Sequence, residues 1–599
     1  MDNRSSDNGR RDAARPVVMD HVETEWQFDA DDLDAVEVWL REQSPPSGFA
    51  LGPEATRELT DTYYDTEDWR LYRAGFALRV RRDGKRVEAT MKSLTPPEDG
   101  GLKKRREFSE PLRSGGVKTL TTARGPVGER LRLLAGIRDL RPLFKVRTRR
   151  RILELRPEGE ANEPDGSSGE VVVGPEGDIH RNEESSEESS VSAEEVTVDA
   201  LGGINRRERG HVLAEVALDE SEFSGSEGKA RLSRIEVEVA DKDTGSYDRV
   251  VGFVDGMRDL LELRPTETSK FETGLSASGL SPVVEPELGS TEIDASLSAA
   301  EVAFAVLRRH FAAMLANEPG VRLGEDPEDL HDMRVATRRL RATLKLYADY
   351  LPKRAGRFER DLHWVAGSLG EVRDLDVHLE RLAGEASEGG ESLEEIATVL
   401  EERRGEARRR MLDTLDSSRY ERLVSGFAGT LRRGRSPAAA EPILEAAPGL
   451  IRRRHKRVRK AADGLSEDSP PEDFHDLRKK GRRLRYALEP LQEIYGRPAK
   501  KMVDLLRELQ DDIGEQQDLV VAAQMLAEGA TPEEGVAGNL PPQTIFSMGS
   551  MAGRYARDAA RMRAAVPGSK AFRALGRGSK EWKRLRKAMK KRTGEKARG

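Results

Sequence analysis

Cysteine is absent from this chain of 599 residues, which excludes disulfides, thiolate metal ligands and cysteine nucleophiles. No apolar run reaches the roughly 18 residues that a membrane-spanning helix needs. The first fifteen residues lack the apolar core of a secretory signal, so a cytoplasmic location is expected. Aromatic residues make up only 5% and rarely lie among the basic segments, so platforms that stack nucleic-acid bases are not expected.

Charged residues are abundant, at 35%, and the length predicts more than one domain. Residues 18–265 alternate polar and apolar side chains as strands do, and residues 295–592 read as helices. The stretch 266–294, rich in Ser, Gly, Pro and acids, is predicted to be a linker. Three further segments are expected to lie outside the folded cores: a disordered N-terminus at 1–17, an acidic insertion at about 156–200 and a basic tail at 593–599.

The sequence of one basic helix occurs twice, as HDMRVATRRLR from His331 and as HDLRKKGRRLR from His475, with a constant offset of 144 residues. In each copy the cations share one helical face and leucines the opposite face. Like charges four residues apart cost about 0.2–0.5 kcal/mol per pair, which a bound anion would relieve. We therefore predict that an anion contacts His331, Arg334, Arg338, Arg339, Arg341 and Lys345 in the first copy and His475, Arg478, Arg482, Arg483 and Arg485 in the second.

Acidic side chains concentrate on the first and last strands of the N-terminal block. An antiparallel sheet that curls up would bring these strands together. Two carboxylates ~5 Å apart repel by about 3 kcal/mol at an effective dielectric near 20, so a cluster requires a divalent cation. All-oxygen ligands favour Mg²⁺ or Mn²⁺. The predicted metal ligands are Glu23, Glu25, Glu215, Asp219, Glu236 and Glu238.

Basic side chains concentrate on the middle strands, where guanidinium and ammonium groups suit phosphate oxygens. Together with two of the acids, three of them are predicted to carry out the chemistry: Glu23, Glu25, Arg79, Arg81 and Lys92. Four others are predicted to hold the substrate: Arg106, Lys145, Arg147 and Arg149. Either Arg105 or Arg106 could face the site, because a register shift of one residue exchanges the faces of a strand.

At these residues the N-terminal block resembles a CYTH domain of the triphosphate tunnel metalloenzyme superfamily. The motifs that carry the resemblance are E-x-E-x-K at Glu23 and Glu25, Y-Y-D-T at Tyr63–Thr66, L-R-x-R at Arg79 and Arg81, T-x-K at Thr90–Lys92 and E-x-E at Glu236 and Glu238. The resemblance implies an antiparallel eight-stranded β tunnel that binds triphosphate-type substrates with Mg²⁺ or Mn²⁺.

The helical block resembles a CHAD domain, whose paired H-x-x-R-x-x-x-R-R-L-R motifs match the repeated basic helix. The segment SKFETG at 269–274 resembles the one that commonly joins these two domains. The resemblance implies an α+β chain whose C-terminal domain is all-α, built from two pseudo-symmetric four-helix bundles that bind inorganic polyphosphate. Association with polyphosphate granules is then one expected location.

The chain departs from the CYTH pattern at Gln27, where the opening motif has lysine. Glutamine forms hydrogen bonds but carries no charge, so substrate binding survives this change better than turnover. We expect hydrolysis of inorganic triphosphate or a related substrate, and less readily cyclisation of ATP. The alternative is a non-catalytic protein that binds or targets polyphosphate through a degenerate tunnel. A third hypothesis, nonspecific contact with nucleic-acid phosphates, is less favoured.

Overall fold

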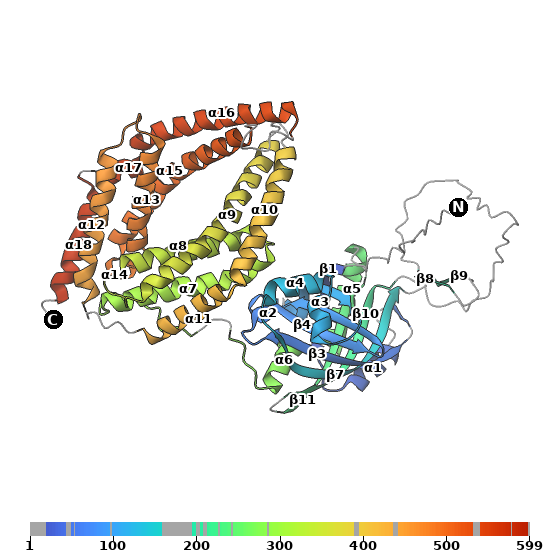
Figure 1. Cartoon of the computed structure of the whole chain (residues 1–599). Coiled ribbons are helices and arrows are strands. Elements are labelled where there is room, and N and C mark those ends of the chain that lie inside the picture. Colours follow the sequence, from blue (N-terminus) through green and yellow to red (C-terminus); the bar gives the residue numbers. More distant parts are fainter. Residues whose placement is uncertain are drawn as a thin grey trace, which may run out of the picture. The chain divides into compact units, whose positions relative to one another are not determined.

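The computed structural model describes residues 19–42, 49–52, 54–95, 99–157, 195–198, 204–207, 212–225, 228–240, 244–283, 287–387, 394–434, 441–530, 540–576 and 578–596. The chain forms two compact units, Met1–Val284 and Glu285–Gly599. Figure 1 shows strands in the first unit and helices in the second. Each unit is described by itself below.

The first unit is a closed antiparallel barrel. Its eight strands, in spatial order, are β10 (Ala214–Ser224), β11 (Lys229–Val239), β1 (Met19–Asp29), β6 (Leu102–Pro111), β5 (Arg86–Ser93), β4 (Phe76–Asp83), β3 (Ala55–Thr66) and β7 (Leu140–Pro157). β7 pairs back to β10 and closes the ring. Two short strands extend it, β2 (Phe49–Leu51) along β7 and β12 (Arg264–Pro265) along β1. The predicted eight-stranded tunnel is confirmed.

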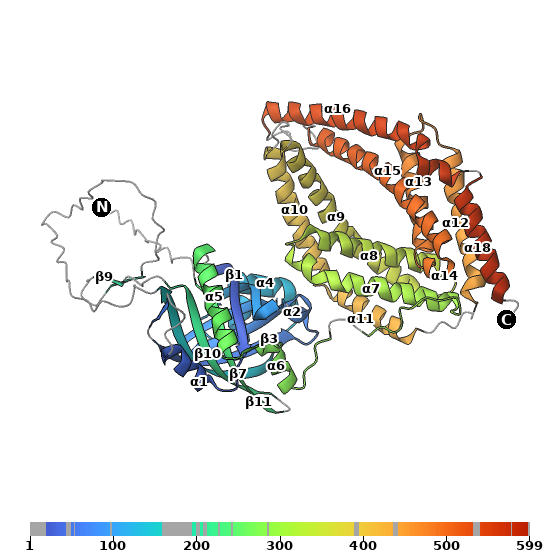
Figure 2. The ribbon, with the colours of Figure 1, turned by 180° about the vertical axis from the view of Figure 1, so that it is seen from behind.

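The hydrophobic core of this unit lies largely outside the barrel. On β1, Trp26 and Phe28 alternate with the acids and are buried beneath helices α1 (Leu33–Glu42) and α5 (Thr244–Leu260). Figure 2 shows α5 lying across the strands. The helices α2 (Arg70–Arg73), α3 (Val117–Thr122) and α4 (Pro126–Ala135) complete this layer. Because helices cover these outer apolar faces, much of the barrel interior is left to charged side chains.

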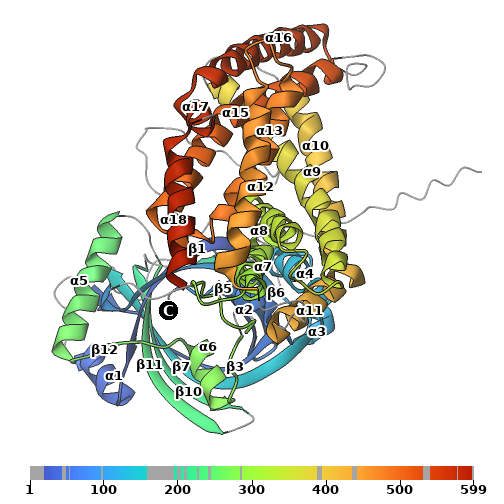
Figure 3. The same cartoon turned by 90° about the vertical axis from the view of Figure 1, so that its left-hand side faces the viewer.

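Helix α6 (Lys270–Ala277) packs against β7, β10 and β11 within the ring of strands (Figure 3). A capping box formed by Ser269 and Glu272 starts it. One turn apart, Phe271 and Leu275 pack against interior residues of β7 and β10, including Phe144. This segment was predicted to belong to the linker 266–294. The structure instead makes it part of the barrel, because these two apolar side chains are buried.

Most of the acidic insertion lies outside the described residues, as do residues 1–17. Within and just after it, β8 (Glu195–Val198) and β9 (Ile204–Arg207) form a two-stranded sheet. Residues 593–596, predicted to belong to the basic tail, are the last turn of α18 (Lys580–Lys596). Within the described ranges, no helix combines the length and hydropathy needed to cross a membrane.

The second unit is all-α, as predicted, and consists of two similar halves. The first contains α7 (Ala299–Leu323), α8 (Pro327–Leu346), α9 (Ala355–Ser387), α10 (Glu394–Leu415) and α11 (Ser418–Arg433). The second contains α12 (Ile443–Asp463), α13 (Pro471–Leu488), α14 (Gln492–Tyr495), α15 (Arg497–Gly529), α16 (Pro542–Ala565), η3 (Val566–Gly568), α17 (Lys570–Leu575) and α18. In the described ranges, four long helices of one half match four of the other, and α11 and α18 follow them.

Two backbone hydrogen bonds mark the pseudo-twofold axis that relates these halves. The amide of Ala299 donates to the carbonyl of Glu441, and the amide of Ile443 donates to the carbonyl of Leu297, both at 2.9 Å. The offset of 144 converts each bond into the other. It also converts the first residues of α7 and α8 into those of α12 and α13. The repeat seen in the sequence is therefore a symmetry of the fold.

Candidate active site and anion-binding pocket

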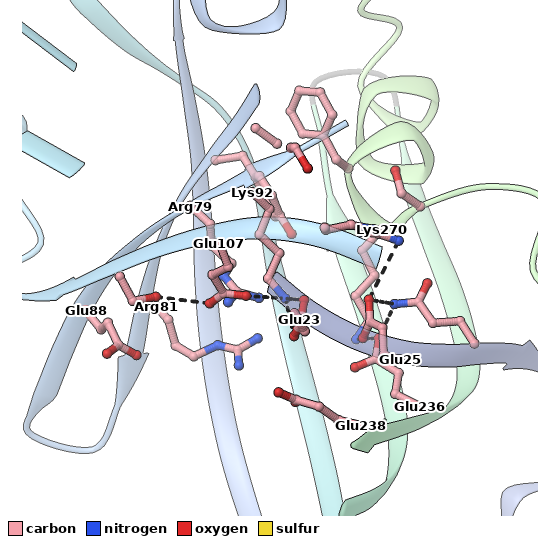
Figure 4. A pocket seen from close by; sticks show the side chains of 18 of the residues that line it. Glu23, Glu25, Arg79, Arg81, Glu88, Lys92, Glu107, Glu236, Glu238 and Lys270 are labelled. Atoms are coloured by element: carbon pink, nitrogen blue, oxygen red, sulfur yellow. Dashed lines mark hydrogen bonds and ion pairs between the residues drawn. The ribbon is translucent and has the colours of Figure 1, made fainter. Parts of the chain in front are cut away.

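The barrel encloses a cavity of about 600 Å³. Figure 4 shows charged side chains entering it from several strands and from α6. The charged and amide residues that line it are Glu23, Glu25, Gln27, Arg79, Arg81, Arg86, Glu88, Lys92, Arg105, Glu107, Arg150, Glu236, Glu238 and Lys270. Neither sign dominates, so the way the charges pair decides what the cavity can bind.

Lys92 joins two acids on the wall formed by β1, β5 and β6. Its Nζ lies 2.8 and 2.6 Å from the carboxylate oxygens of Glu23 and 2.8 Å from Oε2 of Glu107. Burial, reinforced by the charges of Glu25, Glu107 and Glu238, raises the pKa of Glu23 above its ordinary value despite Lys92. Glu23 would thus be stabilised as a carboxylate by further positive charge.

Glu25 and Glu238 lie opposite each other on the paired strands β1 and β11. Burial, together with the charges of Glu25, Glu107 and Glu215, raises the pKa of Glu238 to about 7. Among the described residues, the Glu238 side chain has no hydrogen bond or ion pair, and the cation nearest to Glu25 is distant, Arg105 Nη2 at 3.7 Å. Together with Glu23, which shares Lys92 with Glu107, these carboxylates supply oxygen donors of the kind that a hard divalent cation prefers.

The six predicted metal ligands do not form one cluster. Arg150 forms a bidentate pair with Asp219, at 2.8 and 2.6 Å, and also contacts Glu236. Lys270 of α6 contacts Asp219 and lies 2.8 Å from Glu236. These two acids are therefore neutralised by the protein, and the Glu215 side chain is exposed outside the cavity. Within the described part of the chain, no three His, Asp or Glu side chains are already arranged to hold a metal.

Asp61, which the sequence analysis missed, orients the two arginines of the L-R-x-R strand. Its carboxylate accepts hydrogen bonds from Nε and Nη2 of Arg81 at 2.9 and 2.8 Å, and Arg79 Nη1 lies 3.8 Å away. Burial opposes ionisation of Asp61, but the two guanidinium groups outweigh it and lower its pKa to about 2. Asp61 lies directly opposite Arg81 in the β3–β4 register, a pairing that no motif in the sequence announces.

Gln27 is also held by a residue that the sequence analysis missed, Lys103 on β6. The Lys103 ammonium, 2% exposed, donates to Gln27 Oε1 at 2.7 Å. Since the amide oxygen must face this donor, Nε2 faces the acids and donates to Glu25 at 2.9 Å and to Glu236 at 3.2 Å. The ammonium of Lys103 is therefore one hydrogen bond away from position 27, where the motif has lysine.

The four predicted substrate contacts on β6 and β7 do not line the cavity. Arg105 lines the cavity, whereas Arg106 lies outside, 5.0 Å from the ring centre of Phe108. On β7, Arg150 lines the cavity, and the three predicted residues Lys145, Arg147 and Arg149 are exposed on the outer face. The interior face of β7 carries Phe144, Val146 and Thr148. The sequence predicted the apolar face of this strand to point away from the cavity, so the two faces were exchanged.

In the second unit, a pocket of about 390 Å³ lies where α8, α12 and α13 meet. Eight cations line it and no acid does so among the described residues: Arg338, Arg341, Lys345, Arg454, Arg457, Lys480, Arg482 and Arg483. Arg338 Nε donates to the hydroxyl of Tyr486 at 2.9 Å. Burial and neighbouring arginines lower the pKa of Arg454 and of Arg482 to about 10. Such crowding of like charge favours a bound anion.

Five of the eleven residues predicted from the repeat line this pocket: Arg338, Arg341, Lys345, Arg482 and Arg483. The other six do not: His331, Arg334, Arg339, His475, Arg478 and Arg485. Arg334 pairs with Asp374 at 2.8 Å, and Arg339 and Arg485 pair with Glu489 at 3.4 and 3.3 Å. The contribution of α12 follows from its packing on α13, which the repeat does not encode.

Comparisons with known proteins agree with both folds. Family models place a CYTH domain at residues 41–197 and a CHAD domain at residues 305–527. The first range leaves out β1, β10 and β11, and with them Glu23, Glu25, Glu236 and Glu238. The chain is similar to an uncharacterized protein found in two strains of Mycobacterium tuberculosis, with 27% identity over 235 residues. This match covers 37% of the chain and 43% of that protein, less than half of its length.

Several solved structures are also similar. The CHAD domain from the plant Ricinus communis is 27% identical, covering 48% of this chain and 97% of that one, with a TM-score of 0.40. PptA from Streptomyces chartreusis is 22% identical, covering 46% and 100%, with a TM-score of 0.36. A Hippeastrum protein described as an adenylyl cyclase with dominant triphosphatase activity is 15% identical, covering 43% and 96%, with a TM-score of 0.25. The barrel, the helical repeats and the two family models together show that this chain is a CYTH domain followed by a CHAD domain.

Proposed function

We propose that the CYTH domain is a metal-dependent phosphohydrolase that acts on inorganic triphosphate or a related polyphosphorylated substrate, and that the CHAD domain binds inorganic polyphosphate. The observation that carries the proposal is the cavity itself. Fixed cations line it, together with the carboxylates of Glu23, which shares Lys92 with Glu107, and of Glu238, whose side chain has no ion pair among the described residues. A substrate with several phosphate charges, accompanied by a divalent cation, supplies what each group lacks.

The cations are arranged before the substrate arrives. Asp61 orients Arg79 and Arg81, while Glu23 and Glu107 fix Lys92. These groups would grip phosphate oxygens and stabilise charge that develops as the phosphoanhydride bond breaks. Because their positions are already fixed, little reorganisation is needed in the transition state.

Glu23, Glu25 and Glu238 would hold the metal. When bound, Mg²⁺ or Mn²⁺ neutralises substrate oxygens and polarises water for attack. Gln27 and Lys103 keep the Glu25 side chain aimed into the cavity. Asp219 and Glu236 have a different task, because Arg150 and Lys270 occupy them and tie α6 to the barrel wall.

Gln27 favours a second candidate, a protein that binds polyphosphate without turnover. Glutamine cannot place a charge on the substrate or activate water as a lysine can. Lys103 restores the charge nearby, but Gln27 lies between it and the cavity. The two candidates therefore differ in turnover rather than in binding.

Polyphosphate binding by the second domain is supported by the cationic pocket at α8, α12 and α13. Condensed phosphate places one negative charge on each unit of a flexible chain, which several guanidinium groups can hold at once. Nucleic acid also carries phosphates, but the pocket has only one aromatic side chain, Tyr486, on which a base could stack.

Phosphate release by the purified chain from tripolyphosphate, with Mg²⁺ or Mn²⁺, tests the proposal. We expect metal-dependent release that Lys92→Ala abolishes. Tight tripolyphosphate binding without release would decide for the non-catalytic candidate. Competition between polyphosphate and duplex DNA at fixed salt tests the second domain, and preference for DNA at equal phosphate would contradict its assignment.

A further inference from the structure

The cationic pocket of the CHAD domain lies on one side of the pseudo-twofold axis. Two of its arginines, Arg338 on α8 and Arg482 on α13, are exchanged by the offset of 144 and so belong to both sides. The other cations belong to one side alone. An exact symmetry would therefore generate a second pocket of the same composition opposite the first.

The chain does not complete that second pocket. The offset maps Arg454 onto His310, Arg457 onto Ala313 and Lys480 onto Ala336, so three cations have no counterpart. His310 is neutral at neutral pH, because burial and the adjacent Arg339 and Arg309 lower its pKa to about 4.

A fourth change reverses the charge. Lys345, which lines the pocket, maps onto Glu489. The carboxylate of Glu489 lies 3.4 Å from Arg339, 3.3 Å from Arg485 and 3.9 Å from Arg507. The protein thus places its own anion among the guanidinium groups of the second side.

Most cations of the open side lack such a partner. Arg341 and Lys345 share Glu359, and Lys480 pairs with Asp476. The remaining five cations of the pocket have no ion pair with a carboxylate among the described residues: Arg338, Arg454, Arg457, Arg482 and Arg483. One side of the axis is therefore internally neutralised, and the other requires an external anion.

We propose that the CHAD domain has a single condensed-phosphate pocket per chain, beside α12, and that Glu489 closes the symmetry-related position by acting as a built-in anion. This proposal rests on the proposed binding of polyphosphate by this domain. It adds that the two halves of the repeat are unequal and that a bound chain is held off the pseudo-twofold axis. The ligand recognised is a short run of linked phosphates, free or within a longer chain, because a pocket of about 390 Å³ anchors it.

Titration calorimetry of the full chain with tripolyphosphate in EDTA tests the number of sites. The double variant Arg338→Ala with Arg482→Ala, which removes the two arginines common to both sides, is titrated in parallel, and the binding it retains is assigned to the tunnel and subtracted. We expect one site per chain. Arg457→Ala should weaken it at least fivefold, whereas Arg507→Ala, an exposed arginine on the closed side, should change it less than twofold. Glu489→Gln should add a second, weaker site.

If the double variant does not fold, the single variants ranked by their affinity for long-chain polyphosphate give the answer. Two equal sites, or equal losses from Arg457→Ala and Arg507→Ala, would overturn the asymmetry while leaving polyphosphate binding intact. Absence of binding to either probe would overturn the proposed function of this domain, and this inference with it.

Discussion

At the scale of single residues, the pair Gln27–Lys103 bears most directly on whether the proposed hydrolysis takes place. A lysine at the motif position would place its ammonium in the cavity. Here the ammonium comes from β6 and acts through an amide that reaches Glu25 and Glu236. A positive charge is therefore present near position 27, but the Gln27 side chain separates it from the cavity.

Lys103→Met is expected to lower phosphate release at least tenfold. It removes a charge-assisted hydrogen bond of about 1.5–3 kcal/mol and frees the Gln27 amide to turn away from Glu25. Steady-state phosphate release, with tripolyphosphate affinity measured in parallel, checks this. Gln27→Lys with Lys103→Met is the matched control and should recover activity. Unchanged release by Lys103→Met would show that the pair has no part in turnover.

Arg150 and Arg147 lie three residues apart on β7 but on opposite faces. Arg150→Met should abolish release and lower the free energy of unfolding by about 3–5 kcal/mol, because Asp219 and Glu236 would lose a buried partner. Arg147→Met should change both by little, since its side chain is exposed. Urea unfolding and phosphate release measure the two effects. A larger loss from Arg147→Met would reverse the assignment of the strand.

These residues show what the sequence could predict. Motif spacing identified the strands and seven of the charged residues that line the cavity, because a short strand with one wet face alternates regularly. It failed on β7, whose interior is apolar where α6 packs and charged further along. Three consecutive arginines, 149–151, fit either alternation, so only the three-dimensional register separates Arg150 from its neighbours.

At the scale of elements, α12 and α18 are joined by a stacked pair. The rings of His455 and Trp582 lie 3.7 Å apart and nearly parallel, with an interplanar angle of 5°. Burial, and to a lesser extent the charge of Arg459, lowers the pKa of His455 to about 4. The folded domain therefore holds this imidazole neutral, while the unfolded chain protonates it near pH 6.5.

Stability of the CHAD domain should consequently fall as pH decreases from about 6.5 to 4. In this window the unfolded state binds the extra proton, so His455 costs about 1.4 kcal/mol per pH unit. Above pH 6.5 its contribution is constant. Urea unfolding at several pH values, compared with His455→Phe, checks this. His310 shifts in the same direction, so the variant should keep part of the dependence; an unaltered pH profile would contradict the assignment.

Helix α6 and the choice of pocket cations show two limits of the sequence analysis. The residues around α6 have the Ser, Gly and Pro content of a linker, and only the barrel interior explains why its phenylalanine is buried. The repeat, in contrast, predicted the symmetry of α8 and α13 but not which cations converge, because packing against α12 selects them.

At the scale of the whole molecule, the two proposed sites lie in separate compact units and should fail independently. Lys92→Ala should abolish triphosphate hydrolysis and leave the affinity for long-chain polyphosphate within twofold. Arg338→Ala with Arg482→Ala should weaken that affinity at least tenfold and leave hydrolysis of tripolyphosphate unchanged. Phosphate release and polyphosphate affinity, measured on each full-length variant, check this. Loss of both activities in either variant, with folding retained, would show that one site depends on the other.

The position of α6 bears on which bonds the proposed hydrolysis could reach. Its phenylalanine and leucine pack among interior residues of β3, β4, β7 and β10. A polymer that cannot pass this apolar cluster would be cut from a chain terminus and would release short fragments, in the manner of an exopolyphosphatase rather than an enzyme that cuts internally.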